Sequence, residues 1–246
     1  MKTISLSLSL AAALLCVAQD LRETGPTSLV IVYKCIPEKR VQLLNYMRQS
    51  GIDGFHRRKE SGMLVDYRLL FSRYVDTNNW DMMAVLWFTD YAAVQKWKHV
   101  ERTNPAGLDP SAMANLLSVS SYPVDMVRHA ESSETPPEPV YLVVPYVVST
   151  SLAEYLHYVD DDLRPQFEGW IGEGGLSRYS LFVQRYPGGR PWDNLALFEY
   201  RSDTDFGERE KLAAKVREKL KMPGDRVQPS VAAKEPVIAD ELAPAR

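Results

Sequence analysis

Apolar and polar positions follow one another along this chain in an order that occurs twice. Each half opens with a short β-branched run, which predicts a strand, and continues with apolar residues at helical spacing, which predict a helix. Two further apolar runs, joined by a turn rich in Gly, Pro or Asn, then predict a β-hairpin. A second helix and a closing strand follow. The predicted elements are 29–33, 41–55, 62–74, 82–89, a helix from 90 and 117–127 in the first half, and 140–144, 152–163, 174–186, 195–200, a helix from 203 and 231–238 in the second.

The two halves also share part of their sequence at a fixed offset of 112 residues. The pattern G-x-L-x-x-Y-x-L begins at Gly62 and begins again at Gly174. Weaker matches extend outward from this core, as from Val32 to Val144. A period this long is neither that of a solenoid nor that of a propeller blade, so it predicts a duplicated small domain.

Two residue pairs flank the hairpin turn in both halves. Arg73-Tyr74 recurs as Arg185-Tyr186, and Trp80-Asp81 recurs as Trp192-Asp193. Their double occurrence favours a shared structural role, such as tyrosine packing and an Arg–Asp pair across the turn. The alternative is a ligand rim. Catalytic residues of a duplicated fold are expected where the copies differ.

A polar, Pro-rich segment at 129–139 is predicted to link the halves. We therefore expect a first repeat at 27–128, a second at 140–240 and a tail at 241–246. Each repeat reads βαββαβ, a ferredoxin-like unit with two helices on one face of four antiparallel strands. The bare sheet face of one copy is best covered by the other. The predicted fold is α+β, with two antiparallel sheets packed face to face as a barrel and the helices outside.

In this element order the chain resembles the dimeric α/β-barrel superfamily in its tandem-fused form. The repeated hairpins at 62–88 and 174–200, with helices before and after them, carry the resemblance. No specific member is matched. The superfamily includes cofactor-independent monooxygenases, isomerising enzymes and haem proteins of the chlorite dismutase type, so the resemblance leaves the function open.

The first 18 residues predict a cleavable signal peptide. Lys2 gives a weakly positive start, residues 4–17 are apolar, and Cys16-Val17-Ala18 offers small residues where a signal peptidase cleaves. The alternative is a membrane anchor, but a bilayer needs about 20 apolar residues and this run is shorter. We expect a periplasmic or secreted protein with no membrane contact after signal removal.

Charge and cysteine content narrow the partners further. The formal net charge is −3 and the chain has no Lys/Arg block, which argues against nucleic acid as a partner. Removal of the signal leaves Cys35 as the only cysteine, so no intramolecular disulfide is possible. A buried structural thiol is expected there, and a reactive thiol is the alternative.

Glu199 is the most informative charge, because it replaces Trp87 at the matching position of an apolar strand. The alternate residues of the same strand, at 196, 198 and 200, are predicted to face the helices and pack under them. If Glu199 faces the space between the sheets, burial would favour its neutral form and make it a candidate general base. The alternative is a strand-end position, in water or paired with an arginine.

Further ligand-binding candidates lie on the same predicted hairpins. Arg68, Tyr74, Arg178 and Gln184 are interleaved with apolar residues on the outgoing strands, and Trp87 lies on the returning strand. This pattern fits a half-solvated sheet face. It fits equally a polar-lined lumen that binds a small acid or phenol.

The histidines give no metal-ligand spacing, so we expect no metal site. His56, at the edge of the first helix's apolar stripe, is either a base facing a cleft or a boundary histidine.

A haem needs a committed axial ligand, usually His, and none is placed for that role. Nucleotide and nucleophile motifs are absent. We expect no cofactor, and a haem-dependent enzyme is the less favoured alternative.

The leading hypothesis is binding of a small apolar or aromatic molecule between the sheets. Cofactor-free conversion, as in a monooxygenase or an isomerase, is an extension of it, with Glu199, His56 and Arg178 as the groups to test. The competing hypothesis is a non-enzymatic interaction or scaffold protein, and sheet edges would also permit a homo-oligomer. A packed interior would favour the scaffold. A cavity lined by Glu199 and arginines would favour the ligand site.

Overall fold

The computed structural model describes residues 27–221 and 231–242. The predicted signal peptide at 1–18 and residues 243–246 of the predicted tail lie outside the described residues. Within them the elements occur in the predicted order in both halves. No helix in the described ranges is long and apolar enough to cross a membrane.

The first copy runs from β1 to β4 and the second from β5 to β9. The elements of the first copy are β1 (Ser28–Cys35), α1 (Arg40–Tyr46), α2 (Ile52–Glu60), β2 (Asp66–Ser72), β3 (Met82–Trp87), α3 (Tyr91–Thr103), α4 (Pro110–Met113) and β4 (Leu116–Glu131). Those of the second copy are β5 (Val140–Val148), α5 (Leu152–Tyr158), α6 (Arg164–Gly172), β6 (Leu176–Gln184), β7 (Asn194–Tyr200), α7 (Asp203–Gly207), α8 (Arg209–Lys219), β8 (Val231–Ala233) and β9 (Val237–Glu241).

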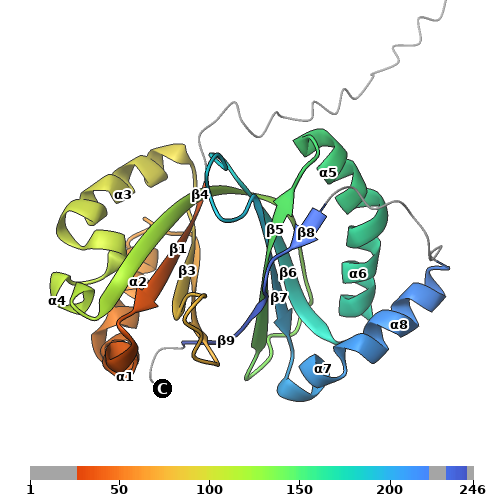
Figure 1. The fold of residues 1–246 in the computed structure, drawn as a ribbon, viewed down its shortest axis with the longest axis horizontal. Coiled ribbons are helices and arrows are strands. Elements are labelled where there is room, and N and C mark those ends of the chain that lie inside the picture. Colours follow the sequence, from red (N-terminus) through yellow and green to blue (C-terminus); the bar gives the residue numbers. More distant parts are fainter. Residues whose placement is uncertain (1–26, 222–230, 243–246) are drawn as a thin grey trace, which may run out of the picture.

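The strands form a closed antiparallel barrel. Neighbouring strands follow the order β7-β6-β4-β1-β3-β2-β9-β5, and β5 also pairs with β7, which closes the ring. The pairs β4–β6 and β2–β9 join the two copies. The helices of each copy cover the outer face of its own sheet (Figure 1). The predicted α+β barrel with outer helices is confirmed.

Strand alternation divides the apolar residues into three cores. The inward positions of both sheets form one core inside the barrel, around Val85, Phe182 and Leu197. The outward positions form one core under the helices of each copy, as with Ala84 and Ala196. The predicted parity of the returning strands is therefore confirmed in both hairpins.

Each copy carries one π-helical turn in its first helix pair, at Met47–Gly51 and at Val159–Leu163. The two turns lie 112 residues apart, in line with the repeat. In the second copy Pro165 lies just after the π turn, in the first turn of α6. The helical segment continues through Gly172. In the sequence Pro165 favours the end of the helix and a separate turn at 166–171, and the structure shows α6 there instead.

The offset of 112 does not hold in the first strand. Asp81 N–H donates to Tyr33 O, and Asp193 N–H donates to Tyr146 O. Tyr33 and Tyr146 are thus equivalent at an offset of 113, and the matched pair of Val32 with Val144 was wrong by one residue. The connection from β5 to its helix is one residue shorter than the connection from β1, which restores the offset of 112 at the π turns.

The boundaries between the copies also differ from the predicted ones. β4 continues through Glu131, because its last residues pair with β6 of the other copy. The connecting segment is correspondingly shorter than 129–139. The closing strand of the second copy is split into β8 and β9 around Pro236, which lacks the N–H that a strand pairing needs. Glu241 belongs to β9, where it pairs with Leu70, and not to the tail.

The repeated arginines and aspartates have structural roles, but they do not form the predicted Arg–Asp pair across the turn. Arg73 forms an ion pair with Asp240 of the second copy at 2.5 Å, and Arg185 forms one with Asp125 of the first copy at 2.9 Å. The arginines thus join the copies at both sheet junctions. Tyr74 and Tyr186 are exposed rather than packed.

Candidate functional site

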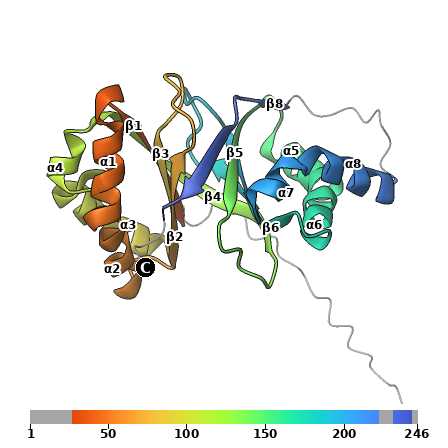
Figure 2. The ribbon, with the colours of Figure 1, turned by 90° about the horizontal axis from the view of Figure 1, so that it is seen from below.

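The barrel is packed at its centre and hollow at both ends. One cavity of about 660 Å³ lies between the β2–β3 and β6–β7 turns, and we call it the hairpin-end cavity. The other, of about 650 Å³, lies beneath the connection between the copies, and we call it the linker-end cavity. Figure 2 shows the hairpin turns and the linker on opposite sides of the barrel.

The linker-end cavity has a charged floor and a proline-rich wall. The floor is built from the inward-facing ends of four strands, β2, β5, β6 and β7, together with β9. The wall is the linker itself, of which Pro136 is buried. The lining residues are Arg68, Arg73, Thr135, Pro136, Pro137, Glu138, Pro139, Val140, Tyr141, Arg178, Glu199, Asp203, Asp240 and Glu241.

Glu199 is buried on the floor, with 5% of its surface exposed. It is the penultimate residue of β7, and a register shift in β6 sets both Ser177 and Arg178 opposite it. Ser177 Oγ lies 2.6 Å from Glu199 Oε1, and Arg178 Nε lies 3.8 Å from Glu199 Oε2. The two positions that the sequence left as alternatives are both occupied by Glu199. It faces the space between the sheets, and it lies at the strand end beside an arginine.

Tyr141 connects Glu199 to a second carboxyl group. Its hydroxyl oxygen lies 2.7 Å from Glu199 Oε2 and 2.8 Å from Glu241 Oε2. A phenol has one hydrogen, so Tyr141 can donate to only one of the two oxygens. The second contact is a hydrogen bond only when a carboxyl group carries a proton and donates it to Tyr141. The geometry therefore fits one extra proton shared by Glu199, Tyr141 and Glu241, which we call the carboxyl–tyrosine cluster.

The environment favours Glu241 as the group that holds this proton. Burial raises the pKa of Glu241, and the negative charge of Glu199 raises it further, against the lowering effects of Arg68 and of the Tyr141 hydrogen bond. Burial also raises the pKa of Tyr141 well above its ordinary value, and both carboxylates add to that shift. Tyr141 therefore stays a neutral donor that can relay a proton between the two carboxyl groups.

Two arginines flank the cluster, and both are already paired. Arg68 Nη1 donates to Asp66 at 2.8 Å, and its Nε lies 3.5 Å from Glu241 Oε1. Arg178 Nη2 lies 3.0 Å from Glu131. Although burial opposes the charge of Arg68, the carboxylates around it raise its pKa, so it remains a cation. The arginines thus limit the repulsion between the carboxylates without neutralising all of them.

The structure brings together three of the residues that the sequence singled out. Glu199, Arg178 and Arg68 all line the linker-end cavity. Trp87 also faces the barrel interior, where its ring lies 6.0 Å from that of Phe182, but it packs in the apolar core below the cavity floor.

The other three candidates lie away from this cavity. His56 is exposed on α2 and pairs with Glu60 at 3.3 Å, on the outside of the barrel. Tyr74 is two-thirds exposed at the end of the first hairpin. Gln184 is buried, and its side-chain amide donates to the carbonyl of Trp192 at 2.6 Å, a bond that holds the second hairpin turn.

Three members of the site escaped the sequence analysis: Tyr141, Glu241 and Ser177. Tyr141 was assigned only to a strand, and Glu241 was placed in the tail. An alternation pattern through Ala239 and Glu241 would have extended β9, and the one-residue shift of β5 would have set Tyr141 opposite Glu199.

No group of three or more His, Cys, Asp or Glu residues in the described part of the chain is arranged to hold a metal ion. Cys35 is 1% exposed, as expected for a structural thiol, and burial raises its pKa to about 12.

Comparison of the sequence with known protein families finds no match, and comparison with curated proteins finds none. Solved structures do match. A proposed monooxygenase from Lactobacillus acidophilus NCFM has a TM-score of 0.55 at 10% identity, over 89% of this chain and 93% of the other. An anthrone oxidase-like protein has a TM-score of 0.51 at 10% identity, over 91% and 93%. A proposed monooxygenase from Fusobacterium nucleatum has a TM-score of 0.52 at 16% identity, over 89% and 94%.

The chain has the dimeric α/β-barrel fold. Both repeats of that fold lie in one polypeptide here, as the element order predicts. At these identities the likeness shows the fold alone, so the chemistry of the site must come from the residues of this chain.

Proposed function

We propose that this protein binds a small molecule in the linker-end cavity and that the carboxyl–tyrosine cluster exchanges a proton with it. One observation carries the proposal: a cavity of about 650 Å³ opens onto two carboxyl groups bridged by one tyrosine, with arginines beside them. A filled barrel end would have favoured a scaffold protein, whereas this lining favours a ligand site.

The roles within the cluster follow from exposure. Glu241 is the accessible member, with 28% of its side chain exposed, whereas Glu199 is 7% exposed and Tyr141 is buried. In its ionised form Glu241 accepts a proton from the ligand, and in its protonated form it returns one. Tyr141 and Glu199 hold the orientation of Glu241 and shift its proton affinity.

The lining also suggests the class of ligand. Pro136, Pro137 and Pro139 offer an apolar wall opposite the charged floor. A small, largely apolar molecule with one carbonyl or phenolic hydroxyl group would contact both. Proton removal beside the carbonyl or from the hydroxyl leaves an enolate or phenolate, whose negative charge Arg68 or Arg178 can stabilise.

The reaction class that this supports is cofactor-free proton transfer. Return of the proton to a different carbon completes an isomerisation with no other reactant. A monooxygenase-like reaction would begin with the same deprotonation and needs O₂ as a co-substrate, a methylene group and O₂ giving a carbonyl group and water. The structural likeness to proposed monooxygenases and to an anthrone oxidase-like protein supports this second possibility at the level of the fold.

Export remains part of the proposal. The apolar segment at 4–17 and the small residues before Gln19 support a secreted or periplasmic protein. Detection of the protein in the extracytoplasmic fraction with Gln19 as its first residue would establish export. The full-length chain in the cytoplasmic or membrane fraction would exclude it.

Ligand binding is tested by native mass spectrometry of the protein purified from its own source. We expect an additional mass that is lost in Arg68→Ala and Arg178→Ala but retained in Arg57→Ala, an arginine on the outer helix α2. The absorption spectrum of the same sample reports any bound chromophore, haem included. The same extra mass on all variants would place the ligand outside the linker-end cavity.

Proton transfer is tested with 2-tetralone, an apolar ketone with exchangeable methylene hydrogens. In D₂O, proton NMR follows the loss of the methylene signal. We expect the wild type to accelerate exchange, and Glu241→Gln to slow the accelerated rate by about 100-fold or more, in the range for loss of a general base. Glu138→Gln, in the linker wall of the same cavity, serves as the matched control. Equal rates for wild type and Glu241→Gln would contradict the assigned role.

A further inference from the structure

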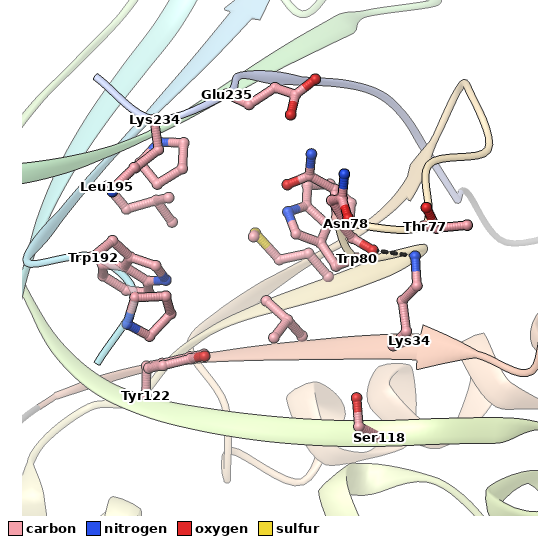
Figure 3. A pocket seen from close by; sticks show the side chains of 15 residues that line it. Lys34, Thr77, Asn78, Trp80, Ser118, Tyr122, Trp192, Leu195, Lys234 and Glu235 are labelled. Atoms are coloured by element: carbon pink, nitrogen blue, oxygen red, sulfur yellow. Dashed lines mark hydrogen bonds between the residues drawn. The ribbon is translucent and has the colours of Figure 1, made fainter. Parts of the chain in front are cut away.

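Trp80 and Trp192 occupy the same position of the two repeats, 112 residues apart, and both line the hairpin-end cavity. Figure 3 shows them on opposite sides of one open space. The Asp that follows each tryptophan is held by the first strand of its own copy: Asp81 accepts the N–H of Cys35 at the end of β1, and Asp193 accepts the N–H of Val148 at the end of β5, both at 2.8 Å. The duplication has thereby placed two indole rings around one cavity.

The aromatic walls are held in place by their neighbours. Tyr122 packs against Trp192 with ring centroids 4.9 Å apart. The guanidinium carbon of Arg190 lies over the Tyr122 ring, 5.3 Å from its centroid. Trp192 and Tyr122 are 6% and 5% exposed, so their rings have little freedom to move. Trp80 is half-buried and lies on the opposite side of the cavity.

The rest of the lining is apolar below and polar above. Val32, Met83 and Leu195 form the base, which belongs to the barrel core. At the rim, Lys34 Nζ donates to the carbonyl oxygens of Asp76 and Asn79 and lies 3.7 Å from Asp81. Its two hydrogen bonds hold the hairpin turn, and Asp81 balances its charge. The remaining charged residues of the lining, Lys234 and Glu235, carry one charge of each sign.

We propose that the hairpin-end cavity is a second ligand site, which binds an uncharged planar aromatic molecule between Trp80 and Trp192. Flat rings stack on indole faces, and an apolar base favours a ligand without charge. A hydroxyl group on such a ligand would reach the polar rim, where Thr77, Asn78 and Ser118 lie (Figure 3). The volume of about 660 Å³ is sufficient for a fused two- or three-ring molecule.

This site is separate from the linker-end cavity. The two cavities share no lining residue, and the packed core around Val85, Phe182 and Leu197 lies between them. The inference therefore stands or falls independently of the proposed proton transfer. Loss of the carboxyl–tyrosine cluster leaves the aromatic walls intact.

The experiment is isothermal titration calorimetry with 2-naphthol, a planar two-ring phenol that is uncharged at neutral pH. We expect the wild type to bind it, and Trp80→Ala to weaken binding about ten-fold, the effect of losing one stacked ring. Trp192→Phe, which keeps a ring at the buried position, should weaken it less. Tyr186→Ala removes an exposed ring from the same hairpin and serves as the control.

Two further measurements identify the site and the class of ligand. Glu241→Gln should bind 2-naphthol as tightly as the wild type, whereas binding that is lost in Glu241→Gln and retained in Trp80→Ala would move the ligand to the linker end and overturn the inference. Cyclohexanol, which is apolar but not planar, should bind at least ten-fold more weakly. No 2-naphthol binding to the folded wild type, or equal affinity for both compounds, would also overturn it.

Discussion

The first and third strands of each copy meet the barrel interior differently at the linker end. In the first copy, Ser28 lies opposite Trp87, and the Trp87 ring packs against Phe182 in the core. In the second copy, the equivalent pair is Tyr141 opposite Glu199, and both side chains are polar. At this matched pair of positions, one copy thus packs the interior while the other presents ionisable groups to the linker-end cavity.

This difference indicates what duplication permits. A barrel made from two identical repeats would carry either two tryptophans or two glutamates at this level. Two facing tryptophans would fill this end of the barrel, and a second buried glutamate would add repulsion between carboxylates. Divergence of the copies leaves one packing residue and one carboxylate. At the hairpin end, in contrast, the copies have kept the same residue, and Trp80 and Trp192 face one cavity from both sides.

The largest expected effect concerns the packed centre that both copies share. Phe182 is fully buried and contacts the Trp87 ring. We expect Phe182→Ala to lower the free energy of unfolding by about 3–5 kcal/mol, the usual cost of removing a buried phenyl ring. Urea denaturation followed by circular dichroism measures it. Tyr186→Ala, at an exposed ring of the same hairpin, should change it by less than about 0.5 kcal/mol.

The sequence predicted most of what the packing requires and little of what the site requires. Three features of the sequence predicted the barrel: the 112-residue repeat, the alternation of apolar residues around positions 84 and 196, and the helical spacing of apolar residues. All three are visible because buried positions recur with a fixed period along a strand or a helix. The carboxyl–tyrosine cluster depends instead on register. A one-residue shift in β5 and a bulge at Ser177 decide which polar side chains meet, and neither leaves a periodic signal.

The position of a single residue shows the same limit. Pro165 favours an end or a kink of the helix in the sequence, yet a π turn lies just before it and the helical segment continues as α6. The same π turn exists in the first copy without a proline, at Met47–Gly51. The turn is therefore a property of the repeat, which a local proline rule does not reveal.

A second prediction compares the equivalent aspartates that follow the tryptophans. Asp81 is buried and accepts from the Cys35 N–H and from Arg40 Nε at 2.9 Å. Asp193 is half-buried and accepts from the Val148 N–H. We expect Asp81→Ala to cost about 2–4 kcal/mol, since it leaves a charged partner unpaired, and Asp193→Ala about 1 kcal/mol. Urea denaturation measures the free energy of unfolding of both variants. An equal loss in the two variants would contradict the prediction and would show that the aspartate stabilises both copies equally.

A third prediction uses the pH dependence of stability. The pKa of Glu241 is raised in the folded protein above its ordinary value of 4.5, first by burial. Between pH 4.5 and the raised pKa of Glu241, the folded state binds more protons than the unfolded state. The free energy of unfolding therefore falls as the pH rises from 4.5 towards the raised pKa. Glu241→Gln removes this loss. We expect the variant to gain stability relative to the wild type as the pH rises above 4.5, and Glu138→Gln to show no such gain. A relative loss with rising pH would contradict the assignment.

The smallest effect is expected at Cys35, where the two copies again differ, since Val148 takes its place in the second copy. Burial raises the pKa of this thiol to about 12. We expect a thiol-specific reagent such as 5,5′-dithiobis(2-nitrobenzoate) to leave Cys35 unmodified at pH 8 until the protein unfolds. The measurement uses Cys16→Ser to remove the other cysteine. Rapid modification of the folded protein would show that Cys35 is accessible.

The central claim is that the second copy carries two coupled carboxyl groups where the first carries a packed ring. Carbon-13 NMR of the glutamate carboxyl groups during a pH titration tests it most directly, without any ligand. The account predicts that Glu241 titrates above 4.5 in the wild type and that Glu199→Gln lowers its pKa, because the neighbouring negative charge is removed. Titration of Glu241 at or below 4.5 with no response to Glu199→Gln would contradict the claim.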